Sequence, residues 1–325
     1  MLVIFLFIIN QSFYHLYAID ILSNKIINER FAPQSADQLW YELTKLDTKK
    51  RPKIALVLGG GGARGFTHIG VLEVFESENI PIDMIVGTSM GAIIGSLSAA
   101  GIKAKQIEEI TAEIKMKDIT KNLFLSAFSL LFRNKFIDSH NIELLVNKYI
   151  DNKKFYELDI PFACVAVDVV TGEKIIMKEG NVASAVRASS SIPGLFEPVE
   201  YKHRHLIDGG IVDNLPISVA KDLGADIIIA VNIESNYTIN QPKTILQVLL
   251  QISYIQGERL KNIAENKADF ILNPKVNNFS MWDINKKKDM ICEGRIEARR
   301  NIEKIKEIIK KKTIEYNIKK NEKIK

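Results

Sequence analysis

Ser89 lies in a sequence pattern that is typical of hydrolase nucleophiles. The segment Gly87–Gly91 fits G-x-S-x-G, between the short apolar run Met84–Val86 and the Ala- and Gly-rich, helix-like segment Met90–Ala100. In a strand–turn–helix context this pattern predicts a nucleophile elbow, a sharp turn that raises the serine hydroxyl above the edge of a sheet. The start of the following helix favours the negative charge that develops during acyl transfer. A serine that only caps the helix is the alternative interpretation.

A second glycine-rich segment, Gly59–Gly65, directly follows the apolar run Ile54–Leu58. Within it, Gly60–Gly65 matches the G-x-G-x-x-G fingerprint of dinucleotide-binding proteins, so a nucleotide cofactor is an alternative ligand for this loop. That fingerprint expects an acidic ribose ligand at the end of the second strand, where this chain has Gly87-Thr88-Ser89, while Asp83 precedes the strand. The P-loop pattern is excluded because no G-K-[ST] follows the glycines.

An oxyanion hole accounts for the glycine loop and the serine together. Parallel neighbouring strands end at the same edge of a sheet, so the loop and Ser89 should share one rim. Backbone N–H groups of the glycines could then bind the oxygen on which negative charge develops. Arg64, in the same loop, could orient it or meet an anionic headgroup, and an exposed surface position is an equal alternative.

A serine nucleophile needs a base, and Asp208 is a credible candidate beside the histidines, although its local signal alone is weak. The chain has five histidines: His15, His68, His140, His203 and His205. The last two differ from Asp208 by odd numbers, so in a strand they face the opposite side. His68 begins the helix after the glycine loop, and we expect it to be packed or hydrogen-bonded there. Asp208 stands in a turn freed by Gly209 and Gly210, although a simple turn aspartate is the alternative interpretation.

The elements that would position these residues alternate between strand and helix. Strands are expected at Ile54–Leu58 and Met84–Val86, each followed by a helix, at Phe66–Glu78 and Met90–Ala100. This order predicts a mainly parallel sheet with helices on both faces. Later elements are expected as strands at 162–169, 174–177, 227–231 and 270–272, and as helices at 182–188, 244–266 and 289–315.

The charge of the chain is concentrated in its C-terminal part. Of a formal net charge of +5, the segment Arg299–Lys325 contributes +7, from eleven Lys or Arg and four Glu, so the remainder is close to neutral.

Cys164 and Cys292 lie far apart and show no metal-ligand spacing, so neither a zinc site nor a disulfide framework is expected.

Two apolar segments bear on membranes. The run Leu2–Ile9 has the length of a signal-peptide core, but no Lys or Arg precedes it and Leu16-Tyr17-Ala18 is a poor cleavage site. It predicts an exported, periplasmic or membrane-associated protein; the alternative is a cytoplasmic protein, peripheral at the membrane, with this segment packed on the domain. The apolar stretch Leu123–Phe132 is expected to pack in the core, and a lid or lipid-contacting helix is the alternative.

Four motifs in this order resemble those of the patatin-like phospholipase family. They are Gly59–Gly65, Gly87–Gly91, Arg187–Gly194 (Arg-Ala-Ser-Ser-Ser-Ile-Pro-Gly) and Asp208–Gly210. Asp168 also resembles the end of a strand in the family. The resemblance covers about Ile54 to Leu223, and it is greatest to the bacterial branch that includes neuropathy-target-esterase-like proteins. It implies the patatin-like three-layer α/β/α fold, with a mainly parallel central sheet and a nucleophile elbow.

The resemblance implies a Ser–Asp dyad without a catalytic histidine. Ser89 would attack an acyl ester carbonyl, and Asp208 would take its proton and later activate water. The residues that would form the oxyanion hole are Gly60, Gly61 and Gly62. The residues that would support the motifs are Arg64, Gly65, Gly87, Gly91, Gly209 and Gly210. The family acts on phospholipids and lysophospholipids and needs no metal or cofactor, so we expect a lipid substrate, contact with a membrane surface and no nucleic-acid partner.

The predicted organisation has five parts. They are a hydrophobic N-terminal segment or signal peptide (1–18), a leader (19–53), a catalytic core (54–221), a completion of the α/β domain (222–298) and a basic helical tail (299–325). A lipid acyl hydrolase is the favoured function. The alternatives are a nucleotide-cofactor enzyme that uses Gly60–Gly65, and an inactive fold that binds anionic membranes through its tail, at about 1 kcal/mol per charge.

Overall fold

The computed structural model describes residues 40–41, 43–46, 50–113, 138–233, 248 and 268–322. The chain divides into two compact units, one formed by residues 53–302 and the other by residues 1–52 together with 303–325. All the motifs identified above lie in the first unit.

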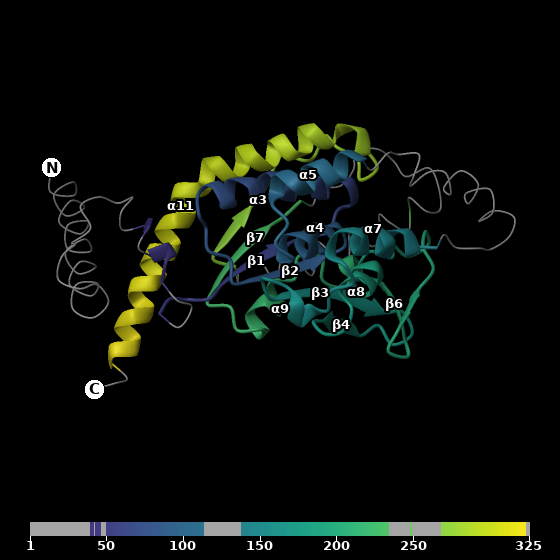
Figure 1. The fold of residues 1–325 in the computed structure, drawn as a ribbon, viewed down its shortest axis with the longest axis horizontal. Coiled ribbons are helices and arrows are strands. Elements are labelled where there is room, and N and C mark those ends of the chain that lie inside the picture. The colour runs from purple at the N-terminus through teal and green to yellow at the C-terminus, as the bar shows by residue number, and fades with distance from the viewer. Residues whose placement is uncertain are drawn as a thin grey trace, which may run out of the picture. The chain divides into compact units, whose positions relative to one another are not determined.

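Within the described residues, eight strands form one mixed sheet in the order β5-β6-β3-β2-β1-β7-β8, with β4 paired to β3 (Figure 1). The strands are β1 (Ile54–Leu58), β2 (Met84–Thr88), β3 (Phe162–Asp168), β4 (Lys174–Met177), β5 (Val199–Tyr201), β6 (Arg204–Asp208), β7 (Ile227–Val231) and β8 (Phe270–Leu272). The pairs β1–β2, β1–β7, β2–β3 and β7–β8 are parallel, whereas β4, β5 and β6 join in antiparallel pairs. The prediction of a mainly parallel sheet is confirmed.

The structure gives the bounds of seven α-helices in the described part of the chain, and Trp40, Tyr41, Leu43, Thr44 and Val248 are also helical. The seven helices are α3 (Thr67–Ser77), α4 (Met90–Ala99), α5 (Ala104–Glu113), α7 (His140–Ile150), α8 (Val182–Ser189), α9 (Ile217–Asp222) and α11 (Lys287–Glu322). Short 3₁₀ turns occur at Gly62–Phe66, Phe155–Glu157, Gly209–Ile211 and Ile284–Lys286.

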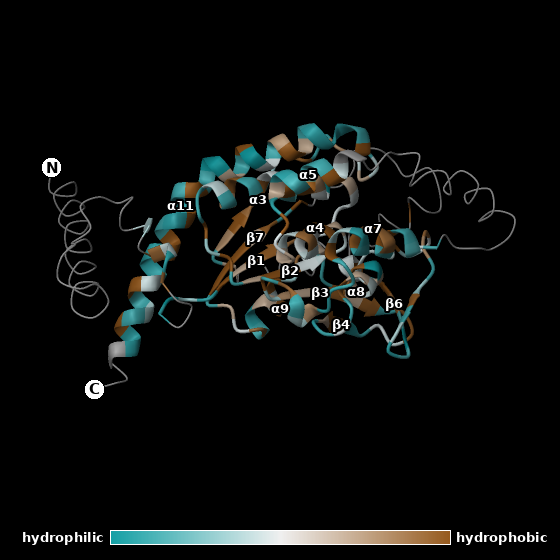
Figure 2. Cartoon of the chain, viewed as in Figure 1, coloured by the Kyte–Doolittle hydropathy of each residue, from teal (hydrophilic) through white to brown (hydrophobic). Residues whose placement is uncertain are grey.

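Helices cover both faces of the sheet, so its central strands are buried on both sides. On one face, Val57 and Val86 pack with Ile217 of α9 in a common apolar cluster. On the other face α4 lies so close that a Cβ on Gly95 would be 3.0 Å from Ile85. Strands buried on both faces are continuously apolar, as the colouring of β1 and β7 shows (Figure 2). The expected three-layer α/β/α arrangement is therefore confirmed.

The first half of α11 packs against α3 through two glycines. A Cβ on Gly70 would overlap the Ile291 carbonyl, and one on Gly294 would overlap the Thr67 carbonyl, so only glycine permits this approach of the two backbones. Arg295 adds ion pairs to Glu73 of α3 and to Glu108 of α5, at 2.6 and 2.7 Å. This part of α11 thus completes the layer of helices on its side of the sheet.

α11 is longer than the helix predicted at 289–315. Its buried positions continue at four-residue spacing through Ile305, Ile309, Thr313 and Asn317. The polar residues at the last two positions conceal the apolar periodicity from which the end of the helix was predicted. In the same unit, the ammonium groups of Lys306 and Lys310 lie 5.7 and 5.9 Å from the centre of the Trp40 ring.

Two further differences concern the region before Asp208. The sequence predicts no hairpin there, whereas β5 and β6 form one whose turn contains Lys202 and His203, both at positive φ. His203 therefore lies in the turn. The argument from odd spacing to Asp208 had assumed that His203 lies in the strand, so that argument does not apply to it.

Several predictions fall outside the described residues: the run Leu2–Ile9, the stretch Leu123–Phe132 and, apart from Val248, the helix at 244–266. Among the helices that the structure describes, none combines the length and the apolar character needed to span a bilayer.

Candidate active site

Ser89 occupies the turn between β2 and α4. Its backbone angles, φ 54° and ψ −123°, are sparsely populated for a residue with a side chain, and such strain persists only where surrounding structure imposes it. The turn is tight enough that a Cβ on Gly91 would overlap the Leu58 carbonyl, while one on Gly87 would lie 2.5 Å from the Gly91 carbonyl oxygen. The local geometry is that of a nucleophile elbow.

Asp208 ends β6, and its carboxylate meets the hydroxyl of Ser89. The Gly210 N–H donates a hydrogen bond to this carboxylate at 2.8 Å, and the Ser89 hydroxyl is close enough to interact with it. Burial raises the pKa of Asp208 from 3.8 to about 6, although the Ser89 hydroxyl and the Gly210 N–H act in the opposite direction. At neutral pH the carboxyl is therefore mostly ionised, yet it is a far better proton acceptor than an exposed aspartate.

The sheet register explains why these two residues meet. β3 lies between β2 and β6; its Val165 pairs with Thr88, and its Ala166 pairs with Asp208. The end of β2 and the end of β6 thus reach the same level, although the two strands run in opposite directions. A Cβ on Gly209 would lie close against Val165, so the turn after Asp208 needs glycine to remain near β3.

The glycine loop packs directly on the elbow. A Cβ on Gly60 would lie 3.1 Å from the Ser89 Cβ and 2.5 Å from Oδ1 of Asn214. The predicted contribution of Gly60 to an oxyanion hole needs correction, because its N–H donates to the Asn214 carbonyl at 3.1 Å. Gly61 and Gly62, by contrast, have no acceptor for their N–H groups among the described residues, and both line the pocket beside Ser89.

Arg64 is buried and fixes the glycine loop, so it is not a solvated surface arginine. Its Nε donates to the Phe279 carbonyl at 2.9 Å, and the neighbouring Ala63 N–H donates to the Met281 carbonyl at 2.8 Å. Phe279 lies more than 200 residues away from Arg64 in the chain. This contact supports the loop-orienting alternative for Arg64.

A pocket joins these elements. Its lining combines the serine, the aspartate and the glycines with apolar side chains: Gly61, Gly62, Ser89, Ile192, Pro193, Asp208, Gly210, Ile211, Asn214 and Met281. The sequence analysis named Ile192 and Pro193 only as part of a family motif, and it missed Ile211, Asn214 and Met281. None of these three has a chemical signature in the sequence, because a place in the site depends on contacts with distant parts of the chain.

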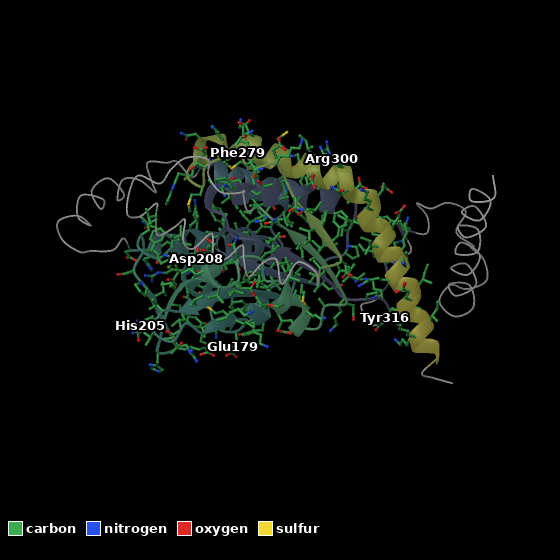
Figure 3. All side chains as sticks on the ribbon, turned by 180° about the vertical axis from the view of Figure 1, so that it is seen from behind. Glu179, His205, Asp208, Phe279, Arg300 and Tyr316 are labelled. Atoms are coloured by element: carbon green, nitrogen blue, oxygen red, sulfur yellow. The ribbon has the colours of Figure 1, made fainter. Side chains whose placement is uncertain are left out.

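None of the four described histidines lines this pocket. His68 is fully buried, and its Nε2 lies 2.8 Å from the Gly59 carbonyl oxygen. Burial lowers the pKa of His68 to about 4, so it is neutral at physiological pH and supports the loop structurally. His205 is exposed and lies farther out on β6 than Asp208 (Figure 3), and His140 pairs with Glu143 at 3.5 Å. His15 lies outside the described residues.

The remaining motif residues serve the structure around the pocket. Asp168 is buried at the end of β3, where it accepts a hydrogen bond from Val170 N–H at 3.0 Å and pairs with Arg204 at 3.3 Å. Arg187 connects α8 to the start of α7 through Asp138 and Ser139, at 3.0 and 2.9 Å. A Cβ on Gly65 would overlap the side chain of Met90, the residue that follows Ser89.

The fold and the site define an α/β protein with a serine nucleophile elbow and an aspartate partner. The family profile described as patatin-like phospholipase matches residues 56–221, just over half of the chain. The chain belongs to the patatin-like phospholipase family.

Relatives agree with this membership. An uncharacterised NTE family protein of Mycobacterium tuberculosis is 34% identical over 187 residues, which are 57% of this chain and 50% of that protein. Human patatin-like phospholipase domain-containing protein 6 is 33% identical over 189 residues, 56% of this chain and 13% of that protein. The matched region is thus at most about half the length of these curated relatives.

A solved structure shows the same fold. Human GIVD cytosolic phospholipase A2 superposes with a TM-score of 0.52 at 8% identity, covering 94% of this chain and 65% of the other. At this identity the likeness concerns the fold alone.

Proposed function

We propose that this chain is a serine acyl hydrolase that cleaves acyl esters of phospholipids or lysophospholipids, with Ser89 as the nucleophile and Asp208 as its base. The observation that carries the proposal is that Ser89 and a buried carboxylate, whose pKa is raised to about 6, interact and line the same pocket. Membership of the patatin-like phospholipase family and a relative named lysophospholipase NTE1, from Scheffersomyces stipitis, support the substrate class; that relative is 32% identical over 186 residues, 56% of this chain and 12% of the relative.

The first half of the reaction acylates the enzyme. As Ser89 Oγ attacks the ester carbonyl carbon, its proton moves to the neighbouring Asp208 carboxylate. The tetrahedral intermediate then collapses, the bond to the leaving alcohol breaks, and Asp208 returns the proton to that alcohol. The products are a lyso-lipid or glycerophospho-alcohol and an acyl ester on Ser89.

The second half releases the fatty acid. Asp208 takes a proton from a water molecule, and the resulting hydroxide adds to the acyl carbonyl. Collapse of this intermediate expels Ser89 Oγ, which recovers its proton from Asp208. Each carboxyl protonation is followed by a deprotonation, so the enzyme returns to its starting state.

The amides of Gly61 and Gly62 are the donors that we assign to the oxyanion in both halves. They line the pocket beside Ser89 and have no internal acceptor among the described residues. Met90 N–H, at the first position of α4, is a further donor next to the nucleophile. In other hydrolases, removal of one oxyanion-hole donor costs about 3–4 kcal/mol, which gives the order of magnitude for such a donor.

The alternative use of Gly60–Gly65 for a nucleotide cofactor has less support. The loop packs on Ser89 and Asn214 so closely that a Cβ on Gly60 would collide with the latter. A phosphate-binding loop needs its amides free at the helix start, whereas those of Gly60 and Ala63 are bonded to protein carbonyls. Saturable binding of NAD(P)H in an equilibrium titration would restore this alternative.

The decisive experiment replaces each member of the dyad. Ser89→Ala and Asp208→Asn should abolish hydrolysis of a short-chain nitrophenyl ester and release of fatty acid from a defined mixture of phospholipids and lysophospholipids, followed by mass spectrometry. A fluorophosphonate probe should label Ser89 in the wild-type protein and nothing in Ser89→Ala. The matched controls, Ser96→Ala in the buried part of α4 and Asp222→Asn on the surface, should keep both activities. Turnover retained by either dyad variant would refute the assignment.

A further inference from the structure

Three consecutive serines, Ser189, Ser190 and Ser191, reach the backbone of both members of the dyad. They follow one another at the end of α8 and in the loop after it, and all three are buried. We propose that Ser189 and Ser190 are positioning residues that hold the backbone of Ser89 in its strained conformation, and so aim its hydroxyl at the substrate carbonyl. This inference rests on the proposed function of Ser89.

Ser189 binds the N–H side of the elbow. Its Oγ accepts a hydrogen bond from the Ser89 N–H at 3.2 Å and donates its own proton to the Val165 carbonyl at 2.7 Å. A serine hydroxyl has a single proton, so donation to Val165 turns a lone pair towards Ser89 and settles the direction of the second bond. Ser189 thereby ties the elbow to β3, the strand that also pairs with Asp208.

Ser190 binds the carbonyl side of the same residue. Its Oγ donates to the Ser89 carbonyl at 3.2 Å, an oxygen that also accepts from Ala92 and Ile93 at the start of α4. Both backbone polar groups of Ser89 are therefore held from outside β2 and α4. The third serine extends the arrangement, because its carbonyl accepts from the Asp208 N–H at 2.9 Å.

The conformation of Ser89 explains why such bonds are needed. A residue with a side chain at φ 54° and ψ −123° costs on the order of 1–3 kcal/mol, and the surrounding structure must offset this cost. Neither Ser189 nor Ser190 lines the substrate pocket, so neither is expected to affect substrate binding directly. Their loss should misorient the hydroxyl, and misplacement of a reacting group by about 1 Å can cost about 100-fold in rate.

The test compares Ser189→Ala and Ser190→Ala with Ser96→Ala, which removes an equally buried hydroxyl whose partner is the Ile93 carbonyl. We expect each of the first two to lower kcat for a short-chain ester, and the rate of fluorophosphonate labelling at Ser89, by about tenfold, with KM changed by less than about twofold. The double variant should lose more than either single variant. The control should keep its kcat and its labelling rate.

Thermal unfolding separates this role from a general structural one. If both variants lose stability but react at the wild-type rate at a temperature where they are folded, the inference is wrong. Should Ser189→Ala fail to fold, Ser190→Ala alone decides by the same criterion. These results are distinct from failure of the proposed function, in which the probe would label a residue other than Ser89 or Ser89→Ala would retain turnover.

Discussion

Ser89 and Asp208 interact although the strands that lead to them do not touch: Ser89 follows β2, Asp208 ends β6, and β3 separates the two strands. β2 is parallel to β3 and β6 is antiparallel to it, so a turn at the end of one strand meets the end of the other. This arrangement buries the carboxylate beside the serine, and burial is the largest cause of the raised pKa of Asp208. The proximity of the two residues and the raised pKa of Asp208 therefore follow from the sheet topology.

The raised pKa predicts the pH dependence of catalysis. Because Asp208 must be unprotonated to accept a proton, kcat/KM for an uncharged ester should rise with pH up to about 6 and stay level above about 7. Rates from pH 4.5 to 8.5 would check this. The pKa of His68 is lowered to about 4 in the folded protein, so the fold becomes less stable as pH falls below about 6.5. Samples should therefore be returned to pH 7 and assayed again, to show that lost activity is not due to unfolding. A reversible profile that stays level down to pH 5 would contradict Asp208 as the base.

The same carboxylate should limit stability. The pKa of Asp208 is higher in the folded state than in the unfolded state. Its contribution to the free energy of unfolding is therefore greatest below about pH 4 and is lost as pH rises through about 6. Raising a carboxyl pKa from 3.8 to about 6 costs about 3 kcal/mol once the group is ionised, at about 1.4 kcal/mol per pKa unit. Asp208→Asn should thus increase the free energy of unfolding at pH 8 by up to about 3 kcal/mol, and much less at pH 4. Denaturant titrations would measure this, with exposed Asp222→Asn as the neutral control; equal stability of Asp208→Asn and wild type at pH 8 would argue against a buried charge.

Adjacent glycines of the loop should tolerate alanine very differently. A Cβ on Gly60 would meet Asn214 Oδ1 at 2.5 Å and the Ser89 Cβ at 3.1 Å, whereas one on Gly61 meets mainly the flexible tip of Ile233 at 3.0 Å. Gly60→Ala should lower kcat and the labelling rate of Ser89 by about 100-fold, and Gly61→Ala by less than about tenfold, since alanine keeps its N–H group. Both rates can be read in the same assays. A larger loss of rate in Gly61→Ala than in Gly60→Ala would mean that the close packing of Gly60 on Ser89 is not important for catalysis.

Replacement of Arg64 can show whether this residue supports the glycine loop or binds the headgroup of the substrate. Because its Nε binds the Phe279 carbonyl, Arg64→Gln should lower kcat/KM by about tenfold for both an uncharged short-chain ester and an anionic phospholipid. Direct binding of a headgroup would instead lower the rate for the anionic lipid alone. Kinetics with the two substrates distinguish these outcomes.

The lysines of the C-terminal half of α11 are expected to contribute to binding of anionic membranes. Lys304, Lys311 and Lys319 are exposed, and each could add about 1 kcal/mol near a negatively charged surface. Replacing all three by Gln should weaken binding to phosphatidylserine-containing vesicles by up to about 100-fold, and should not change binding to neutral vesicles. Vesicle co-sedimentation at fixed ionic strength would measure this, and unchanged affinity would show that the segment is only a solvated helix.

The sequence by itself determined the sheet-and-helix order and the elbow, because both depend on neighbouring residues. The glycines around Ser89 and the apolar runs before it predict a strand–turn–helix without knowledge of the rest of the chain. The sequence also pointed to Asp208, by exclusion of the histidines and by resemblance, but it contains no local signal that this aspartate would be buried.

Only the tertiary structure decided which groups meet at the site. The Gly60 N–H is bonded to the Asn214 carbonyl, Arg64 binds Phe279, and Ser189 binds the backbone of Ser89. Each contact joins segments at least 100 residues apart. A buried polar group must have a hydrogen-bond partner, but many groups in the chain could serve as that partner. A sequence pattern has no means of choosing among such partners, because strand order and register select them.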